Sequence, residues 1–503
     1  MGDAPYWYAH SRPGSPESTW EPLEDHLAAV AARAAKFGAA FDSGQWAALA
    51  GWWHDIGKFR PEFQRRLRGS REQVEHAGAG AALAHSRDVV PVAFAIAGHH
   101  AGLANFQAQG DTRQLALRER VQANTDVLNE LLPLLPAALR NQPTPSPPPF
   151  LAGRDRDGAR RGWEFWIRML FSALVDADYL ATEAFYTPER ETQRPVRSDM
   201  SGLRVRLDER VARFSPNTTV DRLRAQVLAD CRAAAAYAPG IFSLSVPTGG
   251  GKTLSAMAFA LEHAERHGMR RVIMAVPYTS IIEQNAKVLR DALGHSRVIE
   301  QHSNLDESGL LEQFGEAEVR RRLAAENWDA EVVVTTNVQL FESLFANRPS
   351  RCRKLHNIAR SIIVLDEAQA VPTGFLLPVL DALRTLSRDY GCTVVLATAT
   401  QPALSCRDSL PQGLEGVREI ASDPPALARS LRRVRVEWPQ GSDPVAYEQI
   451  AGELAGERRV LAVVHRRRDA RELARMLPAE GLYHLSALMC AKHRAEILDR
   501  IRD

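Results

Sequence analysis

The chain has 503 residues, 45% of them hydrophobic, and a net charge of +2, so several domains with buried cores are expected and any nucleic-acid-binding surface must be local. No apolar run approaches the roughly 20 residues that cross a bilayer, and the N-terminus lacks the layout of a signal peptide. The five cysteines form no CxxC pair, which excludes a zinc ribbon or a disulfide framework and predicts a cytoplasmic protein without a membrane segment.

The first part of the chain, residues 1–190, has a helical pattern rich in Ala and His. Its Pro-rich stretch, residues 142–149, is interpreted as a loop inside this domain because a long helical pattern follows it. Residues 191–220 are polar and poorly periodic, which predicts a linker.

Beyond the linker, short β-branched runs alternate with helical stretches, which predicts parallel sheets covered by helices. The runs are IFSLSV, RRVIMAV, EVVVTT, SIIVLD, TVVLAT and RVLAVV. The first five fit one α/β lobe over residues 221–425. The sixth begins near Arg459 and is expected to open a second lobe over residues 426–503.

The motif HDIGKFRPEFQ places His54 and Asp55 side by side at the end of a helical stretch that begins after Ser43, a suitable N-cap. Gly57 suits the exit of that helix. Adjacent residues on a helix project about 100° apart. One carboxylate can therefore bridge two metals while the neighbouring imidazole binds one of them.

Further candidates for metal ligation lie on other predicted helices: His26, His76, His99, His100 and Asp178. An ionised carboxylate on an apolar helix face, such as Asp178, needs a partner because burying it alone is very costly. Asp176 falls on the other side of the same helix and is expected to be solvated or to stand behind the ligands. His85 breaks the spacing and is expected to be structural.

A single inward-facing histidine is more often a hydrogen-bonded core residue than a ligand, and a lone HD dipeptide means little. Here such histidines and an inward aspartate follow one another across one domain, which predicts a metal site. Imidazole and carboxylate ligands suit Fe, Mn, Ni, Co or Zn, and no cysteine is offered to select a soft metal.

This order, H…HD…H…HH…D, resembles the CRISPR-associated branch of the HD-superfamily nuclease domains over about residues 20–190. The resemblance implies a two-metal site bridged by Asp55. The other ligands would divide into His26, His54 and Asp178 for one metal and His76, His99 and His100 for the other. Two metals ~4 Å apart can activate water and stabilise a leaving oxygen. Lys58 could neutralise phosphate charge, or could be a solvated surface lysine.

The segment SVPTGGGKT follows a predicted strand and opens a predicted helix, which is the context of a phosphate loop. The nucleotide-binding candidates in it are Thr248, Gly249, Gly250, Gly251, Lys252 and Thr253. Backbone N–H groups of the glycines would hold phosphates, Lys252 would reach the β- and γ-phosphates, and Thr253 would hold Mg²⁺. Val246 replaces the usual first glycine, and superfamily 2 helicases commonly open this loop as PTG.

The apolar run SIIVLD ends in an acidic pair that complements the phosphate loop. Asp366 would hold Mg²⁺ through water, and Glu367 would position or activate the attacking water. Gln369 is tolerated in this motif and could sense the nucleotide state. Gln226, upstream of the phosphate loop, is a candidate for contacting adenine.

Other segments resemble the strand-contacting and coupling motifs of superfamily 2 helicases. They are VPYTSIIEQN, TTNVQLFESLF and TATQP, the last at residues 398–402. Their hydroxyl and amide groups would contact phosphates without reading bases. The tail from VVHRRRD resembles the start of a second lobe, and later motifs do not appear before Asp503. We therefore expect a fragment, a shortened form or half of a split protein.

As a whole, the chain resembles the type I CRISPR-associated helicase–nucleases. The resemblance implies a multidomain fold, with an all-α HD-type nuclease domain followed by α/β RecA-like helicase lobes. It implies ATP, Mg²⁺ and two divalent transition metals (Fe, Mn, Ni or Co) as cofactors. The implied partners are single-stranded DNA, R-loop DNA and an RNA-guided surveillance complex of the Cascade type. Two alternatives stay open: an HD phosphohydrolase fused to a repair helicase, and a shortened form that binds DNA without processive movement.

Overall fold

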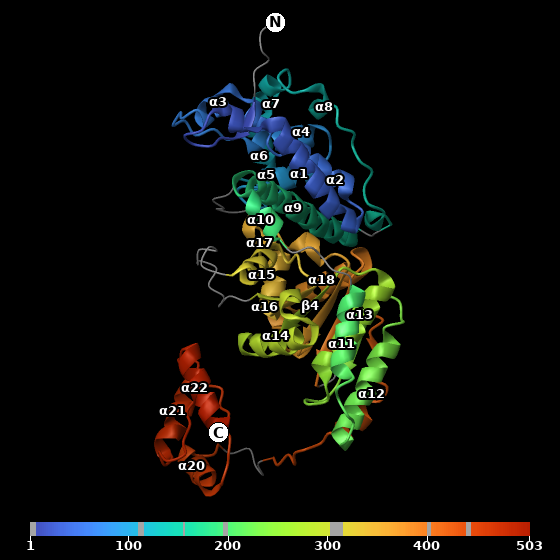
Figure 1. Cartoon of the computed structure of the whole chain (residues 1–503), viewed down its shortest axis with the longest axis vertical. Helices are drawn as coiled ribbons and strands as arrows, with labels where there is room; N and C mark the ends of the chain where they lie inside the picture. The colour runs from blue at the N-terminus through green and yellow to red at the C-terminus, as the bar shows by residue number, and fades with distance from the viewer. Residues whose placement is uncertain are drawn as a thin grey trace. The chain divides into compact units, whose positions relative to one another are not determined.

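A computed structural model describes residues 7–108, 115–153, 156–194, 200–301, 315–399, 404–438 and 444–502. The chain divides into two compact units, Met1–Arg432 and Arg433–Asp503, which are described separately. The first unit contains a helical part and a sheet covered by helices (Figure 1). None of the described helices combines the length and apolar character needed to cross a bilayer.

The helical part is built around α9, a helix of 31 residues that packs against α1, α2 and α5. Its apolar residues alternate at helical spacing with polar ones, so one stripe faces the core. The elements that frame the metal-site candidates are β1 (Tyr8–His10), β2 (Glu21–Pro22), α1 (Leu23–Gly38), α2 (Gly44–Trp53), η3 (Ile56–Phe59), α3 (Pro61–Leu67), α4 (Ala77–Ser86), α5 (Val90–Gly98) and α9 (Arg156–Tyr186).

The seven-stranded sheet has the order β5-β6-β4-β7-β8-β3-β9, and every neighbouring pair is parallel. Its strands are β3 (Ile241–Ser245), β4 (Arg271–Val276), β5 (Val298–Gln301), β6 (Val332–Thr336), β7 (Ser361–Asp366), β8 (Thr393–Thr398) and β9 (Arg418–Glu419). The five runs predicted for the first lobe all form strands. The edge strands β5 and β9 are short, and the predicted runs do not include them.

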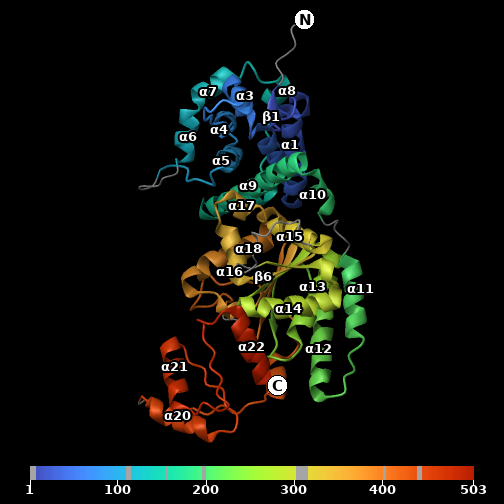
Figure 2. The ribbon, with the colours of Figure 1, turned by 60° about the vertical axis from the view of Figure 1, so that its left-hand side comes forward.

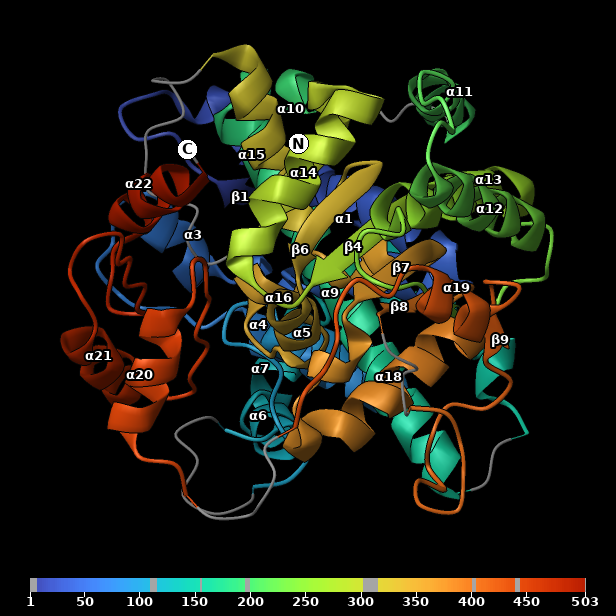
Figure 3. The same ribbon diagram turned by 90° about the horizontal axis from the view of Figure 1, so that it is seen from below.

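The two faces of the sheet contribute to two separate cores, as expected for a parallel sheet covered on both sides. Along β4, Val272 and Met274 face one core, whereas Ile273 faces the other. Helices α11, α12, α13 and α14 cover the first face, and α16 and α18 lie on the other side (Figure 3). The helices of the sheet part used below are α11 (Met200–Val211), α12 (Thr219–Ala234), α13 (Lys252–His267), α14 (Thr279–Leu293), α15 (Glu316–Asn327), α16 (Asn337–Phe345), α17 (Pro349–Cys352) and α18 (Leu376–Asp389).

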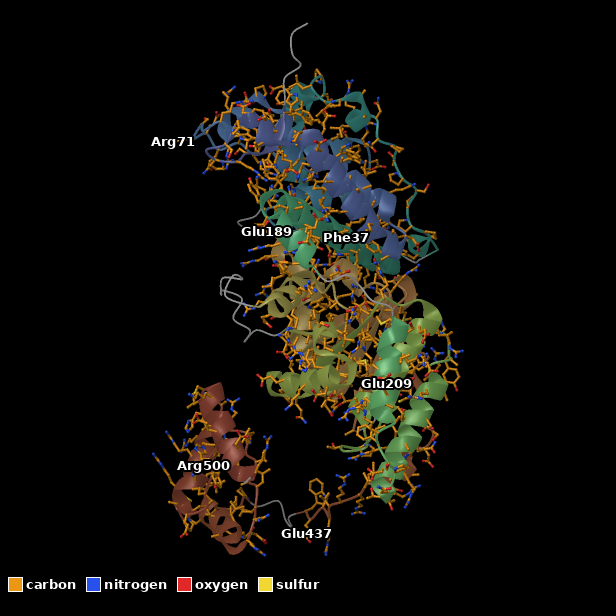
Figure 4. All side chains as sticks on the ribbon, viewed as in Figure 1. Phe37, Arg71, Glu189, Glu209, Glu437 and Arg500 are labelled. Atoms are coloured by element: carbon orange, nitrogen blue, oxygen red, sulfur yellow. The ribbon has the colours of Figure 1, made fainter. Side chains whose placement is uncertain are left out.

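The core on the second face of the sheet continues into the helical part without a break. Phe37, labelled in Figure 4, stacks on His356 of the sheet part with ring centroids 4.4 Å apart. Arg168 of α9 donates a hydrogen bond to the carbonyl of Ala346 over 2.7 Å. The helical part and the first lobe are therefore joined by packing as well as by the chain itself.

The predicted linker, residues 191–220, is only partly a connection. It contains α11, whose Met200, Leu203 and Leu207 are buried against α13 in the core of the sheet part. These apolar residues are spaced for one helix face, and they form a helix because α13 offers a surface that buries them. The expectation of a linker across the whole stretch is wrong for this helix.

The second unit contains α20 (Tyr447–Gly456), α21 (Arg467–Met476) and α22 (Ala491–Arg502). The predicted strand RVLAVV does not form: Val460, Leu461 and Val463 are exposed and belong to neither a helix nor a strand. A strand needs neighbours for its backbone hydrogen bonds, and none pairs with this run in the described part of the unit. This prediction is therefore wrong for the structure as it stands.

Candidate metal centre and nucleotide site

Five helices of the helical part bring the predicted metal ligands together. His26 comes from the buried face of α1, His54 and Asp55 follow α2, and Asp178 lies on α9. His76 directly precedes α4, and His99 and His100 follow α5. His76 had been expected inside a helix. Its place at the helix start leaves its side chain free to turn toward Asp55.

The carboxylate of Asp55 lies between two groups of histidines. Its Oδ2 is 3.3 Å from Nε2 of His54 and 3.9 Å from Nε2 of His26. Its Oδ1 is 3.4 Å from Nε2 of His99 and 3.6 Å from Nε2 of His76. Each oxygen therefore serves one side of the site, as a bridging carboxylate would.

The outer ligands complete the two groups. Oδ1 of Asp178 lies 3.5 Å from Nε2 of His26 and 3.7 Å from Nε2 of His54. On the other side, the Nε2 atoms of His76 and His100 are 2.8 Å apart. Each set places its ligand atoms near a common point: His26, His54 and Asp178 in one set, and Asp55, His76 and His100 in the other.

The donor atoms of this cluster fit divalent metals. Nε2 of His26, His54 and His99 and Oδ1 of Asp55 are buried without a hydrogen-bond partner among the described residues. Buried polar atoms without partners are costly, so the convergence of these atoms suits a site that binds cations. The Nδ1–H groups of His54 and His99 donate to the carbonyls of Gly51 and Ile96. These bonds fix the tautomer that leaves Nε2 free for a metal.

Lys58 is buried beside Asp55 and is not a solvated surface lysine, so that alternative is wrong. Its Nζ lies 2.7 Å from Oδ2 of Asp55 and donates to the carbonyl of Ala9 over 3.3 Å. Burial raises the pKa of Asp55, but Lys58 and His54 outweigh it and hold that pKa well below its usual range. The Asp55 carboxylate is therefore ionised.

Gly57 has a different role from the predicted helix exit. Its φ is not in the left-handed region, but a Cβ at this position would lie 2.1 Å from the carbonyl oxygen of His76. The glycine thus lets the segment after Asp55 touch the backbone that carries His76. Only a residue without a side chain permits this approach.

The expectation that Asp176 is solvated is wrong. It is fully buried, and its two oxygens accept hydrogen bonds from Nε of Arg353 and Nδ2 of Asn327, each over 2.8 Å. Both partners belong to the sheet part. Burial raises the pKa of Asp176, and Arg353 and Asn327 oppose that shift. The contacts described for Asp176 are with Asn327, Arg353 and His356, so the alternative that it stands behind the ligands stays a prediction.

Two residues near the centre were missed by the sequence interpretation. Nδ1 of His10 donates to Oε2 of Glu21 over 2.6 Å, and Nδ1 of His26 lies 3.3 Å from the same oxygen. Burial raises the pKa of Glu21, but the contacts with His10 and His26 lower it to about 2. His10 belongs to β1, far from the HD motif, and no motif spacing singles it out.

The phosphate loop connects β3 to α13, as predicted. Gly249 and Gly251 have φ values of 83° and 85°, which favour glycine. A Cβ on Gly250 would lie 2.5 Å from the side chain of Val246. Thr248 is exposed at the turn, and Lys252 begins the helix. The three glycines are therefore needed for the shape of a loop that presents N–H groups at a helix N-terminus.

The acidic pair lies beside this loop. Nζ of Lys252 is 2.9 Å from Oδ1 of Asp366 and 2.7 Å from Oε1 of Glu367. Gln369 donates to Oε2 of Glu367 over 2.5 Å and accepts from the hydroxyl of Thr398 over 2.7 Å. A polar chain thus runs from the phosphate loop to the end of β8. Thr253 and Asp366 are the groups that would hold Mg²⁺ with a nucleotide.

Arg224, a residue missed by the sequence interpretation, contacts the phosphate loop: its Nε donates to the carbonyl of Gly249 over 2.9 Å. Gln226, the adenine candidate, is exposed two residues later on α12 and donates to Asp230 over 2.8 Å. No contact described for Gln226 tests its predicted role. Residues 400–402 of the predicted TATQP motif lie outside the described part of the chain.

Comparisons with known proteins find a family match in each of the two parts of the first unit. Residues 23–130 match the HD domain family, and residues 232–408 match the DEAD/DEAH box helicase family. These matches lie inside the predicted domains, whose outer boundaries stay predictions. The chain is therefore a fusion of an HD domain and a DEAD/DEAH box helicase domain.

Two curated proteins with similar sequences carry the same name, Cas3. The CRISPR-associated nuclease/helicase Cas3 of Haloferax volcanii is 25% identical over 420 residues, covering 70% of this chain and 45% of that protein. The CRISPR-associated endonuclease/helicase Cas3 of Escherichia coli is 25% identical over 344 residues, covering 61% and 38%. The HD–helicase fusion is thus similar to these Cas3 proteins, and it spans less than half the length of either relative.

Solved structures show the same fold. The crystal structure of T. fusca Cas3 with AMPPNP superposes with a TM-score of 0.53 at 20% identity, covering 79% of this chain and 50% of that one. The structure of T. fusca Cas3 with ADP gives a TM-score of 0.51 at 21% identity, with the same coverage.

Proposed function

We propose that this chain is a metal-dependent DNA nuclease joined to an ATP-driven DNA motor, and that it acts in CRISPR interference. The HD domain would cut single-stranded DNA, including the displaced strand of an R-loop. The helicase part would move the strand past the cutting site. An RNA-guided surveillance complex of the Cascade type would select the target, in the cytoplasm. The names of the similar proteins support the CRISPR assignment.

The observation that supports nuclease activity best is the position of Asp55 between two groups of ligands. His26, His54 and Asp178 would hold one divalent metal, and His76, His99 and His100 the other, with Asp55 shared. Imidazole and carboxylate donors suit Mn, Fe, Co or Ni. When bound, such a metal pair activates water and stabilises the charge that develops on a phosphodiester.

The surroundings of the centre suit a single strand. A hollow of about 190 Å³ beside Lys58 is lined by both cationic and aromatic groups, including Phe63, Arg66, His76 and Tyr186. Cations bind the phosphate backbone and aromatic rings stack on bases without selecting a sequence. Lys58 would orient Asp55 and face the scissile phosphate from the same side.

The helicase part supplies the groups that a nucleotide needs. Lys252 would exchange its contacts with Asp366 and Glu367 for the β- and γ-phosphates of ATP. Thr253 and Asp366 would then hold Mg²⁺, and Glu367 would orient water. The chain from Glu367 through Gln369 to Thr398 offers a path by which hydrolysis reaches the next strand end.

The test is the Asp55→Asn variant, which keeps the shape of the side chain and removes its charge. We expect it to lose both Mn²⁺ ions, measured by equilibrium dialysis, and to cut labelled single-stranded DNA at least about 10³-fold more slowly, since a metal pair supplies several kcal/mol. Asp25→Asn, an exposed carboxylate on α1, is the matched control. Cutting by Asp55→Asn at the wild-type rate would overturn the assignment.

The same preparation separates the alternatives. Hydrolysis of nucleotides by the HD domain, without cutting of single-stranded DNA, would favour a phosphohydrolase. Binding of DNA without any metal-dependent cutting would favour the form that only binds. Both assays use Mn²⁺ and the full chain, so that a single protein sample decides between them.

A further inference from the structure

The short sheet formed by β1 and β2 lies against α1 (Figure 2). Its register places His10 directly opposite Glu21. Residues opposite each other in an antiparallel pair project on the same side, so the two side chains meet. Leu23 follows β2, and its N–H donates to the carbonyl of Trp7. This bond ties the first turn of α1, and with it His26, to the residue that directly precedes β1.

The carboxylate of Glu21 stands between two imidazoles. His10 donates to its Oε2 over 2.6 Å, and Nδ1 of His26 lies 3.3 Å from the same oxygen, although without the alignment of a hydrogen bond. The opposite nitrogen of His26, Nε2, faces Asp178 at 3.5 Å. His26 thus points one nitrogen at the metal centre and the other at Glu21.

The three buried histidines of the cluster, His26, His54 and His99, differ in the groups that orient their rings. His54 and His99 each donate Nδ1–H to a backbone carbonyl one helical turn earlier. His26 has no such bond among the described residues, and its Nδ1 lies 3.3 Å from Oε2 of Glu21. A histidine that ligates a metal almost always donates its other N–H to a carboxylate, a carbonyl or water. For His26, Glu21 is the group in that place.

We propose that Glu21 and His10 are positioning residues that orient His26 toward its metal. Glu21 accepts the Nδ1–H of His26, which leaves Nε2 free to ligate, and His10 holds the carboxylate in place. The proposal rests on the proposed function of the metal centre. It explains why a two-stranded sheet is built so close to the ligands.

Contacts on two sides fix the position of strand β1, which carries His10. The ring of His10 stacks on Phe185 with centroids 6.0 Å apart, and meets the edge of Tyr186 at 5.6 Å. Both aromatic residues lie at the end of α9, which also carries Asp178. On the other side, Gln64 bonds to both the N–H and the carbonyl of Tyr8. The strand therefore cannot shift without disturbing the site.

A third metal held by His10, Glu21 and His26 is the competing interpretation, since these three residues also offer ligand atoms close together. The 2.6 Å between Nδ1 of His10 and Oε2 of Glu21 is the length of a charge-assisted hydrogen bond, so each of these two groups already has the other as its partner without an ion. The distances favour the positioning role.

The test compares Glu21→Gln with Glu24→Gln. Glu24 is an exposed glutamate three residues further along, at the start of α1. Mn²⁺ binding to the full chain is measured by isothermal titration, with the metal content of dialysed protein as a second readout. We expect Glu21→Gln to weaken one of two sites by about 10- to 100-fold, because outer partners of ligands carry about this effect. Glu24→Gln should bind like the wild type.

His10→Phe provides the second variant, because it keeps the ring packing on Phe185 but cannot hold the carboxylate. It should weaken the same site, by less than Glu21→Gln does. Melting curves show whether each variant is folded. Wild-type affinity for both sites in folded Glu21→Gln would overturn the proposal. So would three bound metals in the wild type and two in Glu21→Gln. No Mn²⁺ binding by the wild type would instead refute the proposed metal centre.

Discussion

Asp176 and Arg353 form a buried ion pair that joins the HD domain to the helicase domain, with 2.8 Å between Oδ1 of the aspartate and Nε of the arginine. Asp176 lies on α9, two residues before the metal-ligand candidate Asp178. Arg353 follows α17, on the sheet side of the contact. One helix therefore carries a predicted ligand on one face and the connection to the other domain on another. The packing between the two domains and the metal-site candidates therefore depend on the same helix, α9.

Arg353→Met removes the charge that pairs with Asp176. We expect the free energy of unfolding to fall by about 3–5 kcal/mol, because one buried charge is left without its partner. Urea unfolding followed by fluorescence measures the change. The double variant Asp176→Asn with Arg353→Met should recover part of the loss, since no unpaired charge remains.

Arg351→Met is the matched control for this prediction. Arg351 is an exposed arginine two residues earlier, and its pair with Glu342 lies at the surface. Such pairs contribute about 0–1 kcal/mol. Equal losses in Arg351→Met and Arg353→Met would show that the buried pair does not hold the domains together.

Gly57→Ala should disturb the metal centre although Gly57 ligates nothing. The new Cβ would lie 2.1 Å from the carbonyl oxygen of His76, so the backbone on one side of the contact must move. Overpacking of this kind costs about 1–3 kcal/mol. We expect a lower urea midpoint and weaker Mn²⁺ binding. Gly202→Ala is the control, because its Cβ would lie in open space. We expect it to lower neither the urea midpoint nor the affinity for Mn²⁺. Unchanged metal affinity in Gly57→Ala would contradict the role given to this contact.

Lys252→Ala should weaken ATP binding by about 1.5–3 kcal/mol, which is the usual contribution of a hydrogen bond to a charged group. Binding of a fluorescent ATP analogue measures the loss. Lys287→Ala, an exposed lysine on α14, is the control. Mn²⁺-dependent cutting of DNA that is already single-stranded should be retained, because the phosphate loop and the HD centre lie in different domains. Loss of cutting in a folded Lys252→Ala variant would show that the two sites depend on each other.

His263 should make the first unit less stable as the pH falls. Its Nδ1–H donates to the carbonyl of Ala235, and its Nε2 accepts from the hydroxyl of Thr393. Burial lowers the pKa of His263 to about 4, against an ordinary value of 6.5. The unfolded chain therefore binds more protons between these values, so stability falls from pH 6.5 toward pH 4.

The measurement for His263 is the difference in urea midpoint between the wild type and His263→Gln at a series of pH values. The wild type should lose its advantage as the pH drops below 6.5, while other acid effects cancel in the difference. A constant difference between wild type and His263→Gln from pH 7.5 to pH 5 would contradict the prediction.

Much of the site could be predicted from the sequence because its determinants are local. Adjacent residues such as His54 and Asp55 stay adjacent in any fold, and a loop with glycines at defined positions places Lys252 at a helix start. The ordered histidines and Asp178 were recognised by their helix faces and by resemblance. The five strands of the first lobe were predictable because a strand buried on both faces is continuously apolar.

Only the tertiary structure decided the contacts between distant segments. The burial of Asp176 depends on Arg353 and Asn327, which lie more than a hundred residues further along the chain. Glu21 was missed because its partner His10 is brought to it by strand pairing. The run RVLAVV was predicted as a strand from its own composition, yet a strand forms only where another supplies hydrogen bonds. The sequence by itself determined residue chemistry and local geometry, whereas burial and partnership depend on which distant surfaces meet.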